Sequence, residues 1–245
     1  MKFKLISCEI FYREMEFLLQ QCPHQIDVDF MQKGLHDIPS GDMRARLQHQ
    51  VDAASEQDVD AILLGYGLCN NGLDGLQARN VRLVLPRAHD CITLFFGSRR
   101  RYSEYFDANP GTFFRTTGWI ERDKVSDELR QLSIPNRMGM DLSYEELVEK
   151  YGEDNAEFLW QELCNTERNY AQITFIEMGV EPDASFERTA RDEADEKRWT
   201  FEKVSGDLTL LRRLLGGEWN PEDFLVVPPG HRIVADHSER IVAAK

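Results

Sequence analysis

The first third of the chain alternates between short apolar runs, typical of buried strands, and longer segments whose apolar residues recur at helical spacing. We expect strands at residues 2–7, 25–30, 58–64 and 81–85. Helices are expected at 10–21, from about Ser40 onward, where the serine hydroxyl can cap the helix, and after Cys91, where Gly97 ends the helix. A strand–helix–strand order requires crossover connections, so the pattern predicts a parallel sheet with helices on both faces.

A charged segment with helical periodicity interrupts this alternation. Between 121 and 170 we expect two helices, at 123–132 and 143–166, joined by a looser stretch. The alternation then resumes, with strands at 171–177, 199–204 and 223–227, a helix at 183–197 and another that Ser205 or Asp207 caps and that runs to Leu215. We therefore predict a doubly wound α/β fold with a mainly parallel sheet. It comprises two Rossmann-like lobes, 1–122 and 171–245, which form one compact unit bridged by a helical insertion at 123–170.

Composition narrows the class of protein. The 245 residues can bury a full core, and 42% hydrophobic with 29% charged residues is typical of globular proteins. No apolar run approaches the roughly 20 residues of a membrane helix, and charges interrupt any signal-peptide core. A formal net charge of −14 argues against broad nucleic-acid binding, which needs a basic stripe. We expect a cytoplasmic protein that binds neither membrane nor nucleic acid.

Cysteines follow three of the predicted strands. Cys8, Cys69 and Cys91 each come shortly after an apolar run, and parallel neighbours would deliver them to one sheet edge, where open α/β sheets bind ligands. Five cysteines without paired short spacings do not indicate a disulfide framework. Three thiolates could instead hold zinc with a fourth position open, or a [4Fe–4S] cluster with one iron open. Cysteine also fills space in cores, which is how we interpret Cys22 and Cys164.

Two polar residues precede the third of these cysteines. In an extended turn His89 and Cys91 point the same way, so His89 could be a metal ligand or a general acid or base beside the metal. Asp90 could act there too, or it could orient a neighbouring imidazole. A histidine in a turn is also often simply exposed to solvent, so these alternatives stay open.

The turn before the second cysteine is rich in glycine. The backbone amides of Gly65, Tyr66 and Gly67 could cradle an anion, although a dinucleotide fingerprint would need glycine where Asn70 stands. The side-chain amides of Asn70 and Asn71 could bind a substrate. They equally suit a helix cap or a left-handed turn.

Charged residues elsewhere could complete the site. Arg99 and Arg100 belong to a basic run that is either a solvated helix end or an anion clamp, since arginine matches carboxylate and phosphate in planar geometry. Glu177 and His231 follow strand ends of the second lobe and could close the site if the lobes face each other. The alternative is that both are ordinary polar residues of loops.

Three longer motifs resemble a known family. LGYGLCNNGLDGL, LVLPRAHDCITLFFGS and PGTFFRTTGWIER are together similar to the bacterial and archaeal family catalogued as domain of unknown function 1638. The resemblance covers most of residues 1–120 closely and the rest more loosely. It implies a setting near corrinoid-dependent methyltransferases for methylated amines, and hence one-carbon metabolism. It implies no particular reaction and no residue roles.

Two classes of function follow from these observations. The first is a metal-dependent enzyme, such as a transferase, lyase or hydrolase, that acts on a small molecule in a cleft between the lobes. In it Cys8, Cys69 and Cys91 hold zinc or a cluster, and His89 assists proton transfer. The second is an accessory protein that binds a corrinoid, a metal or a methyltransferase partner without turnover.

Overall fold

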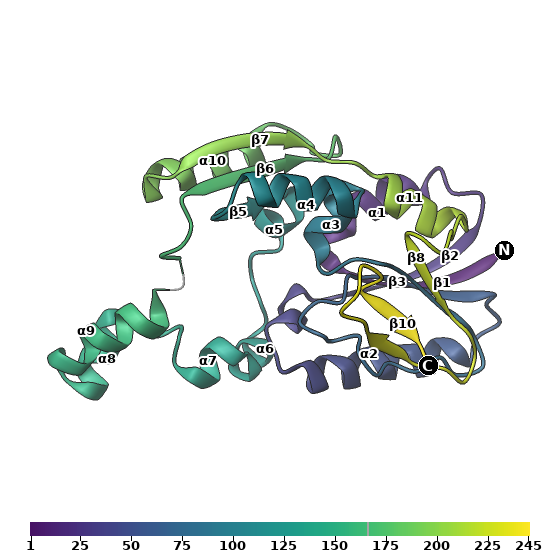
Figure 1. Cartoon of the computed structure of the whole chain (residues 1–245), viewed down its shortest axis with the longest axis horizontal. Helices are drawn as coiled ribbons and strands as arrows, with labels where there is room; N and C mark the ends of the chain where they lie inside the picture. The colour runs from purple at the N-terminus through teal and green to yellow at the C-terminus, as the bar shows by residue number, and fades with distance from the viewer. Residues whose placement is uncertain (166) are drawn as a thin grey trace.

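A five-stranded sheet forms the centre of the protein in the computed structural model, which describes residues 1–165 and 167–245 (Figure 1). Its strand order is β2-β1-β3-β4-β8. The strands are β1 (Lys2–Cys8), β2 (Gln25–Met31), β3 (Ala61–Gly65), β4 (Leu83–Pro86) and β8 (Phe224–Val227). Strands β2, β1, β3 and β4 are parallel to their neighbours, whereas β8 pairs antiparallel with β4. The prediction of an α/β fold with a mainly parallel sheet is confirmed.

Helices cover both faces of this sheet. Helix α2 (Ser40–Ser55) packs on one face, while α1 (Tyr12–Leu19) and α11 (Thr209–Gly216) lie together on the other (Figure 1). Every residue of β3 and β4 is buried. Crossover helices cover both faces of a parallel sheet, so its central strands are apolar without alternation.

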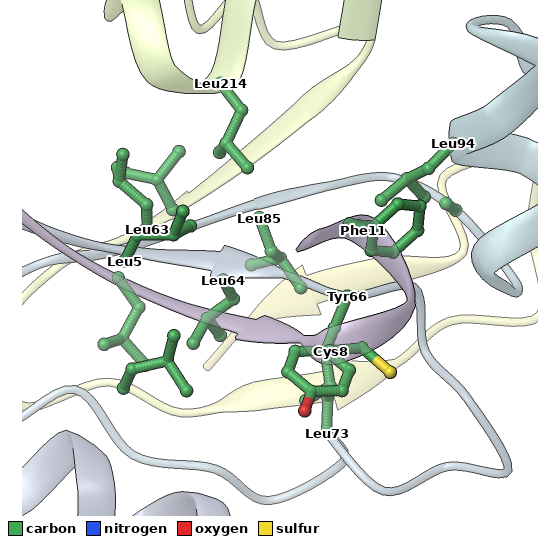
Figure 2. Close-up of a cluster of buried hydrophobic side chains, with 14 of the residues drawn as sticks. Leu5, Cys8, Phe11, Leu63, Leu64, Tyr66, Leu73, Leu85, Leu94 and Leu214 are labelled. Carbon is green, nitrogen blue, oxygen red and sulfur yellow. The ribbon is translucent and has the colours of Figure 1, made fainter. Parts of the chain in front are cut away.

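Leucines from the strands and helices fill the space between these layers. Figure 2 shows Leu5 of β1 near Leu63 and Leu64 of β3, with Leu214 of α11 nearby. All four side chains are 0% exposed. Full burial of one such side chain contributes about 1.5–3 kcal/mol, so this packing is a main source of stability for the sheet that positions the cysteines.

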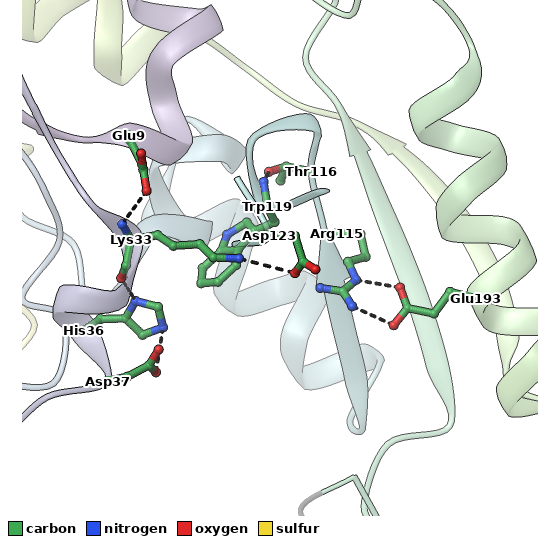
Figure 3. Close-up of polar contacts among 9 residues, drawn as sticks. All are labelled: Glu9, Lys33, His36, Asp37, Arg115, Thr116, Trp119, Asp123 and Glu193. Carbon is green, nitrogen blue, oxygen red and sulfur yellow. Dashed lines mark hydrogen bonds and ion pairs between the residues drawn. The ribbon is translucent and has the colours of Figure 1, made fainter. Parts of the chain in front are cut away.

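A second, three-stranded sheet is formed by later strands. Strands β5 (Thr112–Arg115), β6 (Gln172–Glu177) and β7 (Thr200–Ser205) are parallel, in the order β5-β6-β7. Helix α10 (Ser185–Lys197) packs on β6 and β7. The Arg115 guanidinium donates to both carboxylate oxygens of Glu193 and so ties β5 to α10 (Figure 3).

Short helices follow β4 and β5 and continue into the inserted segment. The first three are α3 (Cys91–Phe96), α4 (Arg99–Ala108) and α5 (Thr117–Glu121). The inserted segment contains α6 (Asp127–Leu132), α7 (Ile134–Met138), α8 (Tyr144–Tyr151), α9 (Glu153–Leu159) and the π-helical turn η3 (Trp160–Cys164). Helices α8 and α9 project at the left of Figure 1. The predicted end of its last helix, Thr166, lies outside the described residues. Within residues 1–165 and 167–245, no helix has both the length and the apolar character needed to cross a membrane.

Three smaller elements complete the structure. Two are short 3-10 turns that follow strand ends, η1 (Glu9–Phe11) after β1 and η2 (Lys33–His36) after β2. The third is an antiparallel pair near the C-terminus, β9 (Ile233–Ala235) with β10 (Val242–Ala244). The two turns matter for the site because they extend the carboxyl edge of the parallel sheet.

Two local predictions were wrong in detail. Helix α2 begins at Ser40 as predicted, but Pro39 occupies the cap position and the Ser40 hydroxyl makes no capping bond. The stretch 133–142 is not wholly irregular, because the Ser133 hydroxyl accepts a hydrogen bond from the Asn136 amide and starts α7. By contrast, Gly97 ends α3 as expected, in the left-handed conformation with φ of 68°.

The two sheets exchange strands across the predicted lobes. Strand β8, from the segment 171–245, completes the first sheet beside β4. Strand β5, from the segment 1–122, belongs to the second sheet. The division of the chain at residues 122 and 170 stays a prediction.

A buried carboxyl lies on the inner side of α1. Glu14 is 0% exposed, and neither of its carboxyl oxygens has a hydrogen-bond partner among the described residues. Burial, with a smaller contribution from the nearby Glu181 carboxylate, raises the pKa of Glu14 to about 8. The folded protein therefore holds this group protonated at pH values where the unfolded chain ionises it.

The raised pKa of Glu14 makes the free energy of unfolding depend on pH. Because the pKa is higher in the folded than in the unfolded protein, the contribution of Glu14 to this free energy is complete below the unfolded pKa near 4.3. It is lost as the pH rises towards 8. We expect Glu14→Gln to flatten the fall in unfolding free energy between pH 5 and 8 by an amount on the order of a few kcal/mol. Denaturant unfolding across this pH range is the measurement. Glu16→Gln, on the exposed side of α1, is the control, and equal pH profiles for the two variants would contradict the account.

Candidate functional site

Three cysteines from different strands line one cavity at the carboxyl edge of the central sheet. Cys8 ends β1, Cys69 lies in the loop after β3, and Cys91 begins α3 after β4. Because β1, β3 and β4 are parallel neighbours, their carboxyl ends lie at one edge. All three cysteines line a cavity of about 170 Å³. The structure thus brings together the residues predicted as ligands, and their binding of metal stays a prediction.

Close backbone packing joins two of the cysteine-bearing loops. The Leu68 amide donates to the Ala88 carbonyl at 2.8 Å, and the Cys69 amide donates to the His89 carbonyl at 3.0 Å. Gly67 is required there, because a Cβ atom would lie 2.7 Å from the Asp90 nitrogen. The loops therefore approach as closely as adjacent strands do.

The loop that carries Cys69 has an uncommon backbone conformation. Cys69, Asn70 and Asn71 have φ values of 40°, 50° and 57°, all in the left-handed region. Asparagine tolerates this region, whereas cysteine rarely adopts it. The left-handed turn considered for the two asparagines is thus present. Asn70 lines the cavity, whereas Asn71 is exposed.

The thiols lie in an apolar environment that disfavours their charged forms. Cys8 is 8% exposed, and Ile10, Phe11 and Leu35 line the same cavity. Burial raises the pKa of Cys8 to about 12. Burial, and then repulsion from neighbouring thiolates, also raises the pKa of Cys69 to about 12 and that of Cys91 well above its ordinary value. The positive charge of Lys33 lowers the pKa of Cys8 less than burial raises it, so these thiols stay protonated at neutral pH.

Two buried donors at the cavity have no acceptor. Tyr66 is 3% exposed and lies beside Cys8 in Figure 2, and its hydroxyl has no hydrogen-bond partner in the described chain. The indole Nε1 of Trp119 is likewise buried and unpartnered. Both residues line the cavity. Buried polar groups are nearly always hydrogen-bonded in native proteins, so these two donors are free to bind an acceptor in the cavity.

A buried lysine supplies positive charge to the same cavity. The Lys33 side chain is 7% exposed and extends along Trp119, with its ammonium 5.2 Å from the ring centroid (Figure 3). Its ion pair is with Asp123 at 3.6 Å, and the Asp123 side chain is 81% exposed. Burial lowers the pKa of Lys33 more than Asp123 raises it. The ammonium therefore lies against the cavity with a solvated carboxylate as its partner.

Asp90 lines the cavity, but its carboxylate is already bonded. One oxygen accepts from the Thr93 amide at 3.0 Å, which caps α3, and from the Thr93 hydroxyl at 3.1 Å. The other oxygen accepts from the Tyr102 hydroxyl at 3.1 Å. Asp90 therefore positions Cys91 at the start of α3. His89 is exposed and does not line the cavity, because α3 begins at Cys91 and the extended turn assumed for residues 89 and 91 ends there.

The Arg run makes contacts away from the cavity. The Arg99 guanidinium donates to the carbonyls of Glu222, at 2.8 Å, and Glu239. Arg100 is 87% exposed and pairs with Glu104 at 2.7 Å along α4. Arg100 is therefore solvated at the start of α4, whereas Arg99 is half-buried and bonded to backbone carbonyls. Their role as an anion clamp stays a prediction.

Three further predicted residues also lie outside the cavity lining. Gly65 ends β3, where a Cβ atom would lie 2.3 Å from the Ser7 hydroxyl oxygen. Glu177 pairs with Lys203 at 3.2 Å. His231 is exposed, with Nδ1 3.2 Å from the Pro229 carbonyl oxygen. The cavity lining thus includes Tyr66, Gly67, Asn70 and Asp90 from the predicted set, besides the cysteines.

The sequence analysis missed Lys33, His36 and Trp119 as cavity residues. Lys33 follows β2, so it lies at the carboxyl end of another parallel strand, and this was the available signal. The His36 ring nitrogens are near the Lys33 carbonyl and, at 3.1 Å, the Asp37 carboxylate. Trp119 lies in α5, directly after β5 of the second sheet, and nothing in the pattern places it here.

As they stand, the described residues contain no group of three or more His, Cys, Asp or Glu side chains that could hold a metal ion. All five cysteines are free thiols. Cys22 and Cys164, interpreted as structural, lie outside the cavity. Their thiols are 3.5 Å from the Leu215 carbonyl and 3.4 Å from the Gly139 carbonyl. The question for function is therefore what the three cavity thiols bind.

The fold and cavity define an α/β protein with a cysteine-lined pocket at the strand ends. The chain belongs to the family described as "Protein of unknown function (DUF1638)", whose model matches residues 30–215. The matched region includes Cys69, Cys91 and Lys33, while Cys8 precedes it. A search of curated proteins found no match.

The packing at Gly67 predicts that a single methyl group disturbs the site. Gly67→Ala places a Cβ atom against the Asp90 backbone, so we expect a loss of about 1–3 kcal/mol in unfolding free energy and faster alkylation of Cys69. Gly41→Ala is the matched control, since its nearest neighbour would be 3.9 Å away and alanine favours the helix. Denaturant unfolding and thiol labelling measure both effects. If the two variants have the same stability, the loops are not in close contact.

Proposed function

We propose that the protein binds a metal centre through Cys8, Cys69 and Cys91 and that a small molecule binds at the open side of this centre. The supporting observation is that three thiols from three neighbouring strands line one cavity. Three protein thiolates leave one position of a tetrahedral zinc ion, or one iron of a [4Fe–4S] cluster, free for a substrate.

The surroundings of the thiols fit such a centre. Thiolates are soft ligands that zinc and iron–sulfur clusters prefer. A thiol in an apolar cavity stays protonated on its own, whereas a coordinated metal deprotonates it outright. The buried Tyr66 hydroxyl, whose neighbours include Cys8 and Cys69, is a donor without an acceptor, and a thiolate sulfur would provide one. The cavity volume of about 170 Å³ is slightly larger than the volume that about five water molecules occupy in the liquid. It leaves room for little more than the metal centre and a small ligand.

The cavity also supports a site between two parts of the chain. The cysteines follow strands of the five-stranded sheet, whereas Trp119 follows β5 of the three-stranded sheet. In this proposal the chain forms two Rossmann-like lobes, and the ligand binds where the two lobes meet. A bound metal centre would polarise the ligand, while Lys33 and Trp119 bind it and the apolar side chains exclude water.

The family resemblance supplies the metabolic context of this proposal. It implies one-carbon or methylated-amine metabolism, in which the small molecule would be converted at the metal centre. An accessory protein that binds a corrinoid or a methyltransferase partner would instead retain the centre without converting a small molecule. Turnover in the presence and absence of such partners separates the two.

Metal content tests the ligand set directly. We expect anaerobically purified protein to contain metal, and Cys69→Ser or Cys91→Ser to lose most of it, because two thiolates hold the centre far more weakly than three. Cys22→Ser and Cys164→Ser are the controls and should retain it. Elemental analysis gives the stoichiometry, and colour identifies the centre: a cluster protein is brown and a zinc protein colourless.

Two results would contradict the proposal. If wild-type protein contains neither zinc nor iron after anaerobic purification, the proposed metal centre is ruled out. Equal metal content in all four variants would show that the cavity cysteines are not its ligands. Thermal unfolding of each variant checks that any loss of metal is not simply a loss of fold.

A further inference from the structure

The positive and hydrogen-bond-donating groups at the cavity outnumber the acceptors that the described residues provide for them. Lys33 and Trp119 line it from two segments 86 positions apart in the sequence, and neither follows a cysteine-bearing strand directly. The Lys33 side chain is 7% exposed, and the Trp119 Nε1 is buried with no acceptor in the described chain. An indole nitrogen only donates and an ammonium only donates, so both require an acceptor.

The acidic groups nearby are already engaged. Both oxygens of Asp90 accept hydrogen bonds from Thr93 or Tyr102. The Glu9 carboxylate accepts from the Lys33 backbone amide at 2.9 Å, not from its ammonium. Asp37 pairs with His36 at 3.1 Å.

Asp123, the carboxylate that pairs with the Lys33 ammonium among the described residues, is a weak partner. Asp123 lies 3.6 Å away and is 81% exposed, so solvent screens its attraction to the ammonium. Its position nevertheless shows that a carboxylate can reach the ammonium. Arg115, whose charge also acts on Lys33, is bonded to Glu193 and adds positive potential without competing for a ligand.

We propose that the cavity binds a small anion, a short carboxylate, whose oxygens accept from the Lys33 ammonium and the Trp119 indole Nε1. A ligand in this position lies beside Cys91, because the Trp119 side chain is near enough to that thiol to act on its pKa. The cavity volume of about 170 Å³ suits a short carboxylate such as acetate or propionate. The functional role of this anion rests on the proposed metal site. Its binding does not, because Lys33 and Trp119 are not metal ligands.

Short carboxylates are the probes for this site. We expect acetate and propionate to bind to the full-length protein in calorimetry and to raise its Tm, while hexanoate and ethylammonium do neither. Lys33→Met keeps the aliphatic stem and removes the charge, and Trp119→Phe keeps a ring and removes Nε1. Each should weaken propionate binding by about tenfold or more, the usual effect of losing a hydrogen bond to a charged group.

The controls separate this inference from the metal proposal. Lys124→Met removes an exposed lysine close by and should bind propionate as the wild type does. Metal content should be unchanged in Lys33→Met and Trp119→Phe. If propionate binding depends on Lys33 in protein that holds no metal, the anion site stands and the metal centre falls. If metal is present but propionate does not bind, or binds equally to Lys33→Met and the wild type, the anion site is wrong.

Discussion

Two backbone hydrogen bonds join the loop that carries Cys69 to the segment that leads into Cys91, and the geometry of the cavity depends on them. They form only because Gly67 has no side chain to separate the loops. The parallel pairing of β1 with β3 then brings Cys8 to the same place. Residues far apart in sequence thus meet through main-chain contacts, which hold them more firmly than surface loops would.

The chemical character of the cavity follows from burial. Desolvation disfavours charge on the thiols and on Lys33 alike, since it raises the pKa of the former and lowers that of the latter. In the proposed site, a bound metal ion would stabilise the thiolates and a bound anion would stabilise the Lys33 ammonium. A cavity with unpaired donors and protonated thiols is consistent with a site whose charges are completed by its ligands.

Much of the scaffold could be predicted because apolar runs and glycine positions are local signals. The strands that carry Cys8 and Cys69 and the helix end at Gly97 came from such patterns. The antiparallel addition of β8 to β4 could not, because the direction of an edge strand is decided by tertiary pairing. The exposure of His89 depends on where α3 begins, and a shift of one residue in a turn reverses which side chains face the site. Trp119 and Lys33 meet only through the full fold.

X-ray absorption at the metal edge of anaerobically purified protein tests the central claim most directly, because it reports the atoms bound to the metal. The account predicts a first shell dominated by sulfur, at about 2.3 Å if the metal is zinc, which is lost when Cys8, Cys69 and Cys91 are all replaced by serine. A first shell of nitrogen and oxygen alone, or a sulfur shell that persists in the triple variant, would contradict it.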